Sequence, residues 1–164
     1  MPNQIPQTRT AEVDGFVGGK FDDLYRSEYV PMVKLARGLV DTSERAEEIV
    51  QDAFAKVFER WDRLSEPGGY LRVSVINGAR SELRKRDVGR RLGFVRRAEA
   101  VTGEPDYLID ALDQLSANQK TVLVLRYYAD LSEKEIAESL NIRPGTVKST
   151  ASRALARLRK ALEQ

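Results

Sequence analysis

Apolar side chains recur at three- and four-residue steps between residues 43 and 61, which is the period of an amphipathic α-helix. Asp41 or Ser43 is expected to cap the first turn of this helix, because short polar side chains accept hydrogen bonds from free N–H groups there. The apolar positions are Ala46, Ile49, Val50, Ala53, Phe54, Val57, Phe58 and Trp61. The opposite face is acidic and polar, with Glu44, Glu48, Gln51, Asp52 and Glu59.

The same period marks two other segments of the N-terminal half. Residues 21–39 carry an apolar side, and Pro31 predicts a kink or a restart within that helix. A third helix is expected from about Tyr70 to Arg86, and the segment before it, residues 62–69, has the composition of a loop. The apolar positions of this third helix stack at four-residue steps: Leu71, Val75, Ala79 and Leu83.

The last third of the chain contains explicit signals for helix starts. Ser116 and Ser132 each stand three residues before a Gln or Glu, the spacing of a capping box. Pro144 suits the first position of a final helix that runs to about Leu162. We expect the inward positions of that helix to be Val147, Ala151, Ala154, Leu155, Leu158 and Leu162.

The pattern predicts an all-α protein, because no segment alternates with the two-residue period of a strand. We expect two small helical domains joined by a flexible linker. Residues 1–19 read as a disordered leader, 20–87 as the first domain, 88–106 as the linker and 107–164 as a second domain that contains a helix-turn-helix.

Composition excludes several classes of function. Among its 164 residues the chain has no cysteine and no histidine, which excludes disulfides, thiolate or imidazole zinc sites and Ser-His-Asp triads. We therefore expect no catalytic residues, no metal and no cofactor, and not an enzyme. The apolar runs are far too short for membrane insertion, and the polar N-terminus does not resemble a secretory signal, which favours a cytoplasmic protein.

Charge is distributed unevenly, although the net charge is only +2. Residues 80–97 and 143–160 each sum to +6, and the rest of the chain is acidic. Two basic clusters on an acidic chain are typical of a protein that binds phosphate groups at two places.

The second basic cluster lies in a predicted helix-turn-helix from Ile136 to Arg157. Small and hydroxylated residues near a helix N-terminus allow close approach to base edges, and longer basic side chains reach phosphates. The residues expected to face DNA are Arg143, Gly145, Thr146, Lys148, Ser149, Ser152, Arg153 and Arg157.

Each of these features also has an ordinary structural interpretation. Residues 136–157 fit a helical hairpin with a solvated basic face, and the acidic face around Glu48 fits a surface that only aids solubility. Residues 66–69 fit a connector, and the basic end at residues 84–86 fits a solvated helix terminus.

Taken in order along the chain, these residues resemble an extracytoplasmic-function (ECF) sigma factor of bacterial RNA polymerase, a member of the sigma-70 family. The resemblance rests on residues 21–25 and 46–54, on Tyr70-Leu71 followed by Asn77, and on the basic run after it. In the last third it rests on residues 135–137, 145–149 and 153–154. The chain departs from the family pattern with Tyr70, where Trp is frequent, and with Thr150, where an Arg that contacts phosphate is common.

The resemblance implies a role for each motif. Glu48, Gln51 and Asp52 would contact the clamp of the largest subunit of core RNA polymerase. The loop at residues 62–69 would receive a flipped base of the −10 element. The −10 contacts would come from Tyr70, Asn77, Arg80 and Arg84. The eight residues of the helix-turn-helix given above would bind the −35 element.

The function implied is therefore that of a sigma factor, which binds core polymerase, recognises the −10 and −35 elements and helps to melt promoter DNA. A stand-alone helix-turn-helix regulator of duplex DNA is the alternative, but it leaves the face around Glu48 and the basic helix after Tyr70 without a role. The implied partners are core RNA polymerase, promoter DNA and an anti-sigma factor, although no residue of this chain identifies the last.

Overall fold

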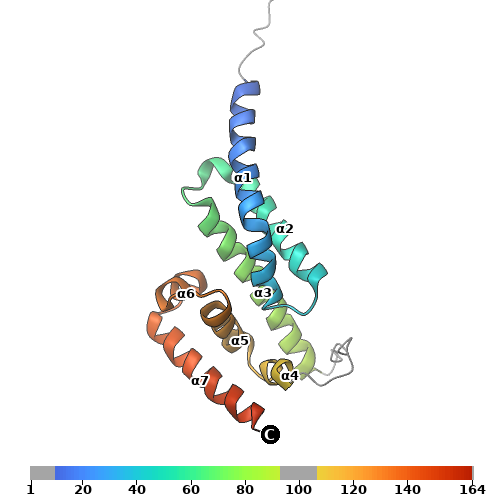
Figure 1. Ribbon diagram of the computed structural model, residues 1–164, viewed down its shortest axis with the longest axis vertical. Helices are drawn as coiled ribbons and strands as arrows, with labels where there is room; N and C mark the ends of the chain where they lie inside the picture. Colours follow the sequence, from blue (N-terminus) through green and yellow to red (C-terminus); the bar gives the residue numbers. More distant parts are fainter. Residues whose placement is uncertain (1–9, 93–106, 164) are drawn as a thin grey trace, which may run out of the picture.

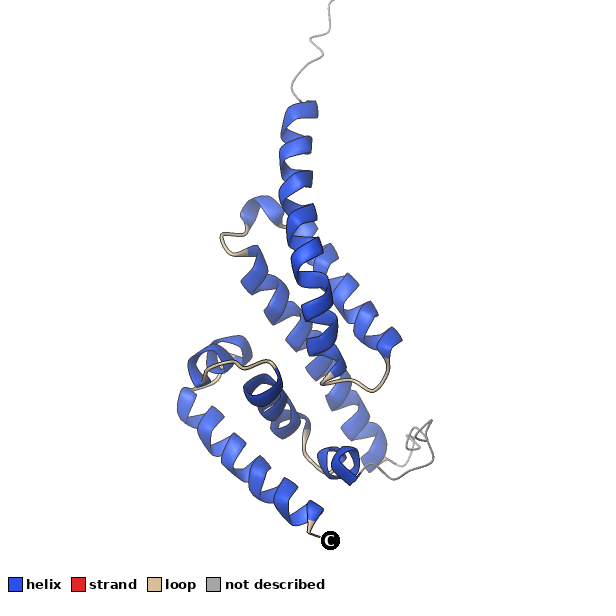
Figure 2. Cartoon of the chain, in the orientation of Figure 1, coloured by secondary structure: helices blue, strands red, loops and turns tan. Residues whose placement is uncertain are grey.

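The computed structural model describes residues 10–92 and 107–163, which are helical apart from short turns and contain no strand (Figures 1 and 2). The all-α fold class predicted from the sequence is confirmed. The N-terminal elements are α1 (Thr10–Arg37), α2 (Ser43–Glu59), the short 3₁₀ turn η1 (Trp61–Arg63) and α3 (Pro67–Arg91). The C-terminal elements are α4 (Tyr107–Asp113), α5 (Ala117–Leu123), the π-helical turn η2 (Val124–Tyr128), α6 (Glu133–Leu140) and α7 (Pro144–Leu162).

Helices α1, α2 and α3 pack into an N-terminal domain, and the apolar period of α2 decides which face it buries. The buried residues are Ala46, Ile49, Val50, Ala53, Phe54 and Val57. Two expectations for α2 were wrong. Its cap is Thr42, whose hydroxyl accepts from the Arg45 N–H at 3.2 Å, rather than Asp41 or Ser43. Phe58 is 59% exposed because it lies at the edge of an aromatic cluster, against the Phe21 ring at 5.1 Å.

Helix α1 differs from its expected form at its start and at Pro31. It begins at Thr10, inside the segment expected to be a disordered leader, and residues 1–9 of that leader lie outside the described residues. It also runs through Pro31 as one helix, so no restart occurs there. The expected loop at residues 62–69 is also mostly helical, since η1 ends at Arg63 and α3 begins at Pro67 rather than at Tyr70. Helix α3 extends to Arg91, into the expected linker, and residues 93–106 of that linker lie outside the described residues.

The C-terminal domain begins its helices where the sequence predicted. Both capping boxes are present: the Ser116 and Ser132 hydroxyls accept from backbone N–H groups, and Gln119 and Glu135 bind back to the cap N–H groups. Asn141 ends α6 in the left-handed conformation, with a φ of 52°, and Pro144 then starts α7. Helices α6 and α7 thereby form the predicted helix-turn-helix.

Helix α7 buries only part of the side that its sequence predicts to face inward. Val147, Ala151 and Ala154 are buried, and Leu158 packs on a small cluster formed by Leu115, Leu123 and Ala154. Leu155 and Leu162 are 36% and 48% exposed, so the expectation that they face inward was wrong. Helix α7 packs against α4, α5 and α6.

The two domains pack directly against each other, which the sequence did not predict. Helices α5 and α6 lie beside α3 in Figure 1, and both contact it. Buried residues of α1, α2 and α3 form one continuous apolar cluster with Val124, Leu125 and Ile136 of the C-terminal domain. A Cβ added at Gly38 would lie 2.9 Å from the Val124 Cγ1 atom, so glycine is what allows this close approach.

Candidate polymerase and nucleic-acid interfaces

The acidic face of α2 is exposed to solvent. Glu48, Gln51 and Asp52 are all exposed, opposite the buried Ile49 and Phe54. Three neighbouring polar side chains on one rigid helix form a surface that suits a basic partner.

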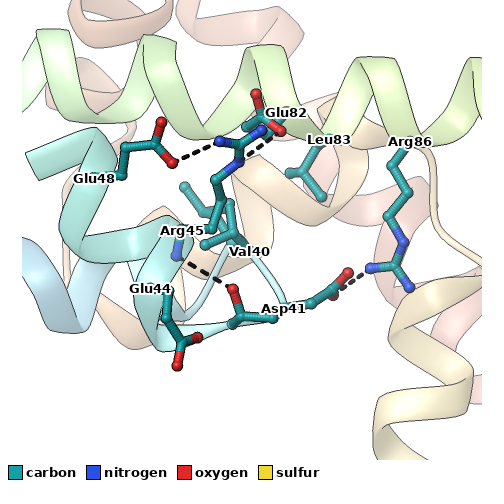
Figure 3. A pocket seen from close by; sticks show the side chains of 10 residues that line it. Val40, Asp41, Glu44, Arg45, Glu48, Glu82, Leu83 and Arg86 are labelled. Atoms are coloured by element: carbon teal, nitrogen blue, oxygen red, sulfur yellow. Dashed lines mark hydrogen bonds and ion pairs between the residues drawn. The ribbon is translucent and has the colours of Figure 1, made fainter. Parts of the chain in front are cut away.

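Glu48 does not stand alone on this face, because Arg45 lies between it and α3 (Figure 3). The Arg45 Nη1 atom donates to Glu48 Oε2 at 2.6 Å, and its Nε atom donates to Glu82 Oε2 at 3.2 Å. The hydrogen bond to Glu48 and the charges of the two carboxylates raise the pKa of Arg45. The charge that Glu48 offers to a partner is therefore partly neutralised within the chain.

A cavity of about 420 Å³ opens beside this pair, between the turn that follows α1, the start of α2 and the C-terminal half of α3 (Figure 3). Its floor is apolar, with Leu39, Val40 and Leu83, and its rim is charged. Arg86 closes the far side, where it pairs with Asp41. The rim residues are Asp41, Glu44, Arg45, Glu48, Glu82 and Arg86.

The four residues expected to contact the −10 element lie along α3, but their surroundings differ. Asn77 and Arg84 are exposed, whereas Tyr70 and Arg80 are half-buried. The guanidinium carbon of Arg60 lies 5.7 Å from the centre of the Tyr70 ring, close enough for a cation–π contact. One face of Tyr70 is thus already occupied by a cation.

Arg80 binds the C-terminal domain. Its Nε and Nη2 atoms donate to the Asn118 Oδ1 atom of α5, at 3.1 and 2.8 Å. Burial lowers the pKa of Arg80, and the positive charge of Arg84 lowers it further, although a guanidinium keeps its proton in proteins.

Two residues about two turns beyond Arg80 also bind the C-terminal domain. The Asp87 Oδ2 atom accepts from the Ala117 N–H at 3.0 Å, and Arg86 Nη2 donates to Asp113 Oδ2 at 3.4 Å. Sequence reasoning missed Asn118, Asp87 and Asp113, because nothing in a local pattern pairs residues about thirty positions apart.

The eight residues expected to bind the −35 element are all exposed, on α7 and at Arg143 just before it. Helix α7 contains no acidic residue, and within the described part of the chain its basic side chains form no ion pair with an acid. An added Cβ at Gly145 would meet nothing within 4 Å, so this first turn is open to a ligand.

Arg153 and Thr150 refine this surface. The Arg153 Nε atom donates to the Ser149 carbonyl oxygen at 3.3 Å, which holds its guanidinium along the helix. Thr150 is 9% exposed and faces the core, so a side chain at this position lies on the inner side of α7. Thr150 is therefore not part of the exposed surface of α7.

The described residues contain no group of three or more carboxylates placed to hold a metal ion. None of the helices in residues 10–92 and 107–163 combines the length and the apolar character needed to span a membrane.

Comparison with protein families assigns both domains. Residues 24–88 match the model of sigma-70 region 2, and residues 106–158 match that of sigma-70 region 4. These segments coincide with the α1–α3 domain and with the domain that contains the helix-turn-helix.

Relatives with curated names match both domains together. The RNA polymerase sigma-E factor of Streptomyces antibioticus is 32% identical over 153 residues, which cover 88% of this chain and 85% of that protein. The ECF RNA polymerase sigma factor SigL of Mycobacterium tuberculosis is 25% identical over 155 residues, 86% of this chain and 88% of that protein.

Solved structures show the same fold. The sigma factor RpoE of Bartonella quintana, in complex with the anti-sigma factor NepR, has a TM-score of 0.65 and 27% identity over 88% of this chain and 97% of that one. CnrH, in complex with the cytosolic domain of CnrY, has a TM-score of 0.64 and 19% identity over 92% and 97% of the two chains.

A two-domain helical chain with sigma-70 regions 2 and 4 is a sigma factor. More narrowly, this chain belongs to the ECF group of the sigma-70 family. The stand-alone helix-turn-helix regulator is not favoured, because region 2 is present as well. Sigma factors are DNA-recognition proteins without catalysis of their own.

Proposed function

We propose that this chain directs core RNA polymerase to promoters by binding polymerase through α2 and promoter DNA through α3 and α7. The observation that carries the proposal is that each charged surface lies in the sigma-70 region whose partner it suits. The acidic face of α2 lies in the segment that matches region 2, and the acid-free basic face of α7 lies in the segment that matches region 4.

On the polymerase side, Glu48, Gln51 and Asp52 would contact the clamp of the largest subunit. Their exposure on a rigid helix supports this assignment, since exposed carboxylates attract basic groups and steer their approach. The rest of α2 is anchored by its buried face, so a change at these positions leaves the fold intact.

On the −10 side, Tyr70, Asn77, Arg80 and Arg84 would hold the melted strand. The segment at residues 62–69, which spans the end of η1, the turn at residues 64–66 and the first turn of α3, would receive a flipped base. Unstacking costs a few kcal/mol per base step. Stacking on an aromatic side chain returns about 1–3 kcal/mol per base, and basic side chains add contacts to the backbone. Melting then follows from preferential binding of the single strand.

On the −35 side, the exposed residues of α7 would enter the major groove. Lys148 and Ser149 lie in the first turns, where a recognition helix reads base edges, and Arg153 and Arg157 lie further along. A good base contact discriminates by about 1–3 kcal/mol, whereas a phosphate contact weakens all sequences alike when it is lost.

The likeness to RpoE, which was solved in complex with the anti-sigma factor NepR, supports a further partner. We propose that an anti-sigma factor holds this chain as NepR holds RpoE. Co-purification of the full chain from its own host, followed by identification of a stoichiometric partner that blocks transcription, tests this assignment.

Transcription with purified core RNA polymerase tests the proposed function. The chain is expected to give promoter-dependent transcripts, and selection from a randomised −35 library is expected to yield one consensus. Replacing Lys148 and Ser149 together should shift that consensus, while Arg159→Ala should lower activity without shifting it, because it removes only a backbone contact. An unchanged consensus in the double variant would remove the base-reading role.

A pre-melted template separates melting from the other steps. Asn77→Ala and Arg84→Ala should reduce open-complex formation on duplex promoter and matter much less on a template with a preformed bubble. Equal losses on both templates would assign these two residues to packing or to duplex binding.

A further inference from the structure

Arg60 belongs to none of the sequence motifs described above, yet its side chain lies over the ring of Tyr70. The guanidinium carbon is 5.7 Å from the ring centre, within the range of a cation–π contact. Arg60 follows the last residue of α2, and Tyr70 lies in the first turn of α3. The two side chains therefore meet across the base of the segment at residues 62–69, which is proposed to receive a flipped base.

The main chain holds Arg60 in place without using its side chain. The Arg60 N–H donates to the Val57 carbonyl oxygen at 3.2 Å, and the Arg60 carbonyl oxygen accepts from the Arg63 N–H at 2.8 Å. These bonds form the junction between α2 and η1, while the Arg60 side chain is exposed. A substitution that changes only this side chain should therefore leave the junction intact.

The charge of Arg60 is not neutralised by a neighbouring carboxylate. Among the residues that the structure describes, Arg60 forms no ion pair, whereas Arg45 of the same helix pairs with both Glu48 and Glu82. A guanidinium that lies over an aromatic ring and pairs with no acid presents its positive charge to solvent, where a phosphate backbone is attracted to it.

Arg60 extends the surface that is proposed to hold the melted strand. Tyr70, Asn77 and Arg84 follow one another at seven-residue steps, about two helical turns, so they lie along one stripe of α3. Arg60 covers the residue at the N-terminal end of this stripe. Because Arg60 is exposed and Tyr70 is half-buried, a base that reaches this end meets the guanidinium before the ring.

The chemistry of the pair suits an unpaired base. A guanidinium is planar and stacks on aromatic side chains, and nucleic-acid bases stack on guanidinium planes in the same way. Arginine adds a cation–π contribution to stacking, and its charge favours the neighbouring phosphates. Stacking of this kind accepts any base, because every base has a π face.

We propose that Arg60 is a further strand-binding residue, which forms with Tyr70 a composite platform on which one unpaired base of the melted strand stacks. This inference rests on the proposed role of α3 in melting. It adds a residue outside α3 to that role, and it assigns to the platform an unpaired base of any identity.

Binding of the full chain with core polymerase to a promoter template pre-melted over the −10 element tests the proposal. Arg60→Lys keeps the charge and removes the plane, so we expect about three- to tenfold weaker binding. Arg26→Lys makes the same change at an exposed arginine of α1 and should match the parent. Unchanged affinity in Arg60→Lys, or an equal loss in Arg26→Lys, would overturn the proposal.

An abasic site moved along the non-template strand locates the stacked base. At one position, removal of the base should weaken binding of the parent, and Arg60→Lys should then cause no further loss, because both changes remove the same contact. All four bases at that position should bind alike. Additive losses at every position would show that Arg60 acts through the fold or through charge alone, and would exclude the stacking role.

The contribution of Tyr70 is separated in a Tyr70→Leu background. Leucine keeps an apolar side chain but removes the ring that positions the guanidinium, so Arg60→Lys should have a much smaller effect there. If Arg60→Lys weakens binding as much in that background as in the parent, the two residues act independently and the composite platform is wrong.

The two proposals fail in different ways. A parent chain that gives no promoter-dependent transcripts with core polymerase fails as a sigma factor of that polymerase, whatever Arg60 does. A chain that transcribes normally, but whose Arg60→Lys variant matches the parent on the pre-melted template, keeps the proposed function and loses the composite platform.

Discussion

At the scale of single residues, exposure could be predicted but partners could not. All eight residues assigned to the −35 surface are exposed, because the 3.6-residue period of α7 fixes which side faces the core. The partners of the charged residues come from distant parts of the chain: Arg45 binds Glu82, and Arg80 binds Asn118. No local pattern encodes such pairs, which depend on how the helices pack.

The Arg45–Glu48 pair leads to a prediction about polymerase affinity. Glu48→Lys should weaken binding to core polymerase by about tenfold, since it reverses the charge offered to a basic partner. Arg45→Ala should strengthen binding by about two- to fivefold, the range expected when an exposed charge loses a competing partner. Fluorescence anisotropy of the labelled chain titrated with core polymerase measures both.

Glu59→Lys is the matched control for that experiment. It makes the same charge change on an exposed residue of the same helix, two turns beyond Asp52. Equal weakening by Glu48→Lys and Glu59→Lys would show that net charge, rather than a specific contact at Glu48, governs binding.

At the scale of elements, the sequence pattern predicted the buried faces and the first residues of the helices well. It predicted poorly which residues at the margins of those faces are buried. The buried face of α2 and both capping boxes follow from spacing alone. The exposed Phe58 and Leu162 could not be predicted, because burial at the margin of an apolar stripe depends on whether a neighbouring helix reaches it. Pro31 is tolerated inside α1, although a proline in a helix interior usually breaks or kinks it.

The second capping box predicts a pH dependence for α6. The Ser132 N–H donates to Glu135 Oε2 at 2.8 Å, and this bond, with that to the Ser132 hydroxyl, lowers the pKa of Glu135 below its ordinary value of 4.5. A carboxylate with a lowered pKa in the folded state stabilises the fold above its unfolded pKa. That stabilisation is lost as the pH falls through the folded pKa.

Denaturant unfolding at pH 7 and pH 3.5 measures this dependence. Glu135→Gln should retain the cap, as Gln119 does in the first box, and should lose less stability than the parent between these two pH values. If Glu135→Gln shows the same loss on acidification as the parent, then other carboxylates account for the acid sensitivity.

At the scale of the whole molecule, the sequence predicted two domains but not that they dock. The local pattern of the residues that join the domains fits an exposed position as well as a docked one. The sequence pattern therefore does not predict docking. Gly38 is one such position, because it lies after the last turn of α1 and reads as a simple helix end. The structure shows instead that it lies against η2 of the other domain.

Gly38→Ala is therefore predicted to loosen the docked state without disturbing either domain. The added Cβ would lie 2.9 Å from Val124 Cγ1 and 3.4 Å from Tyr128 Cδ1, both on η2, and such overpacking typically costs about 1–3 kcal/mol. The radius of gyration from small-angle X-ray scattering should rise while helical circular dichroism stays constant. Gly19→Ala, where nothing lies within 4 Å, is the control and should change neither quantity. An unchanged radius together with a lower melting temperature would show that Val124 repacks in place. In that case the interface is as rigid as a single core, and the two domains do not separate in the free chain.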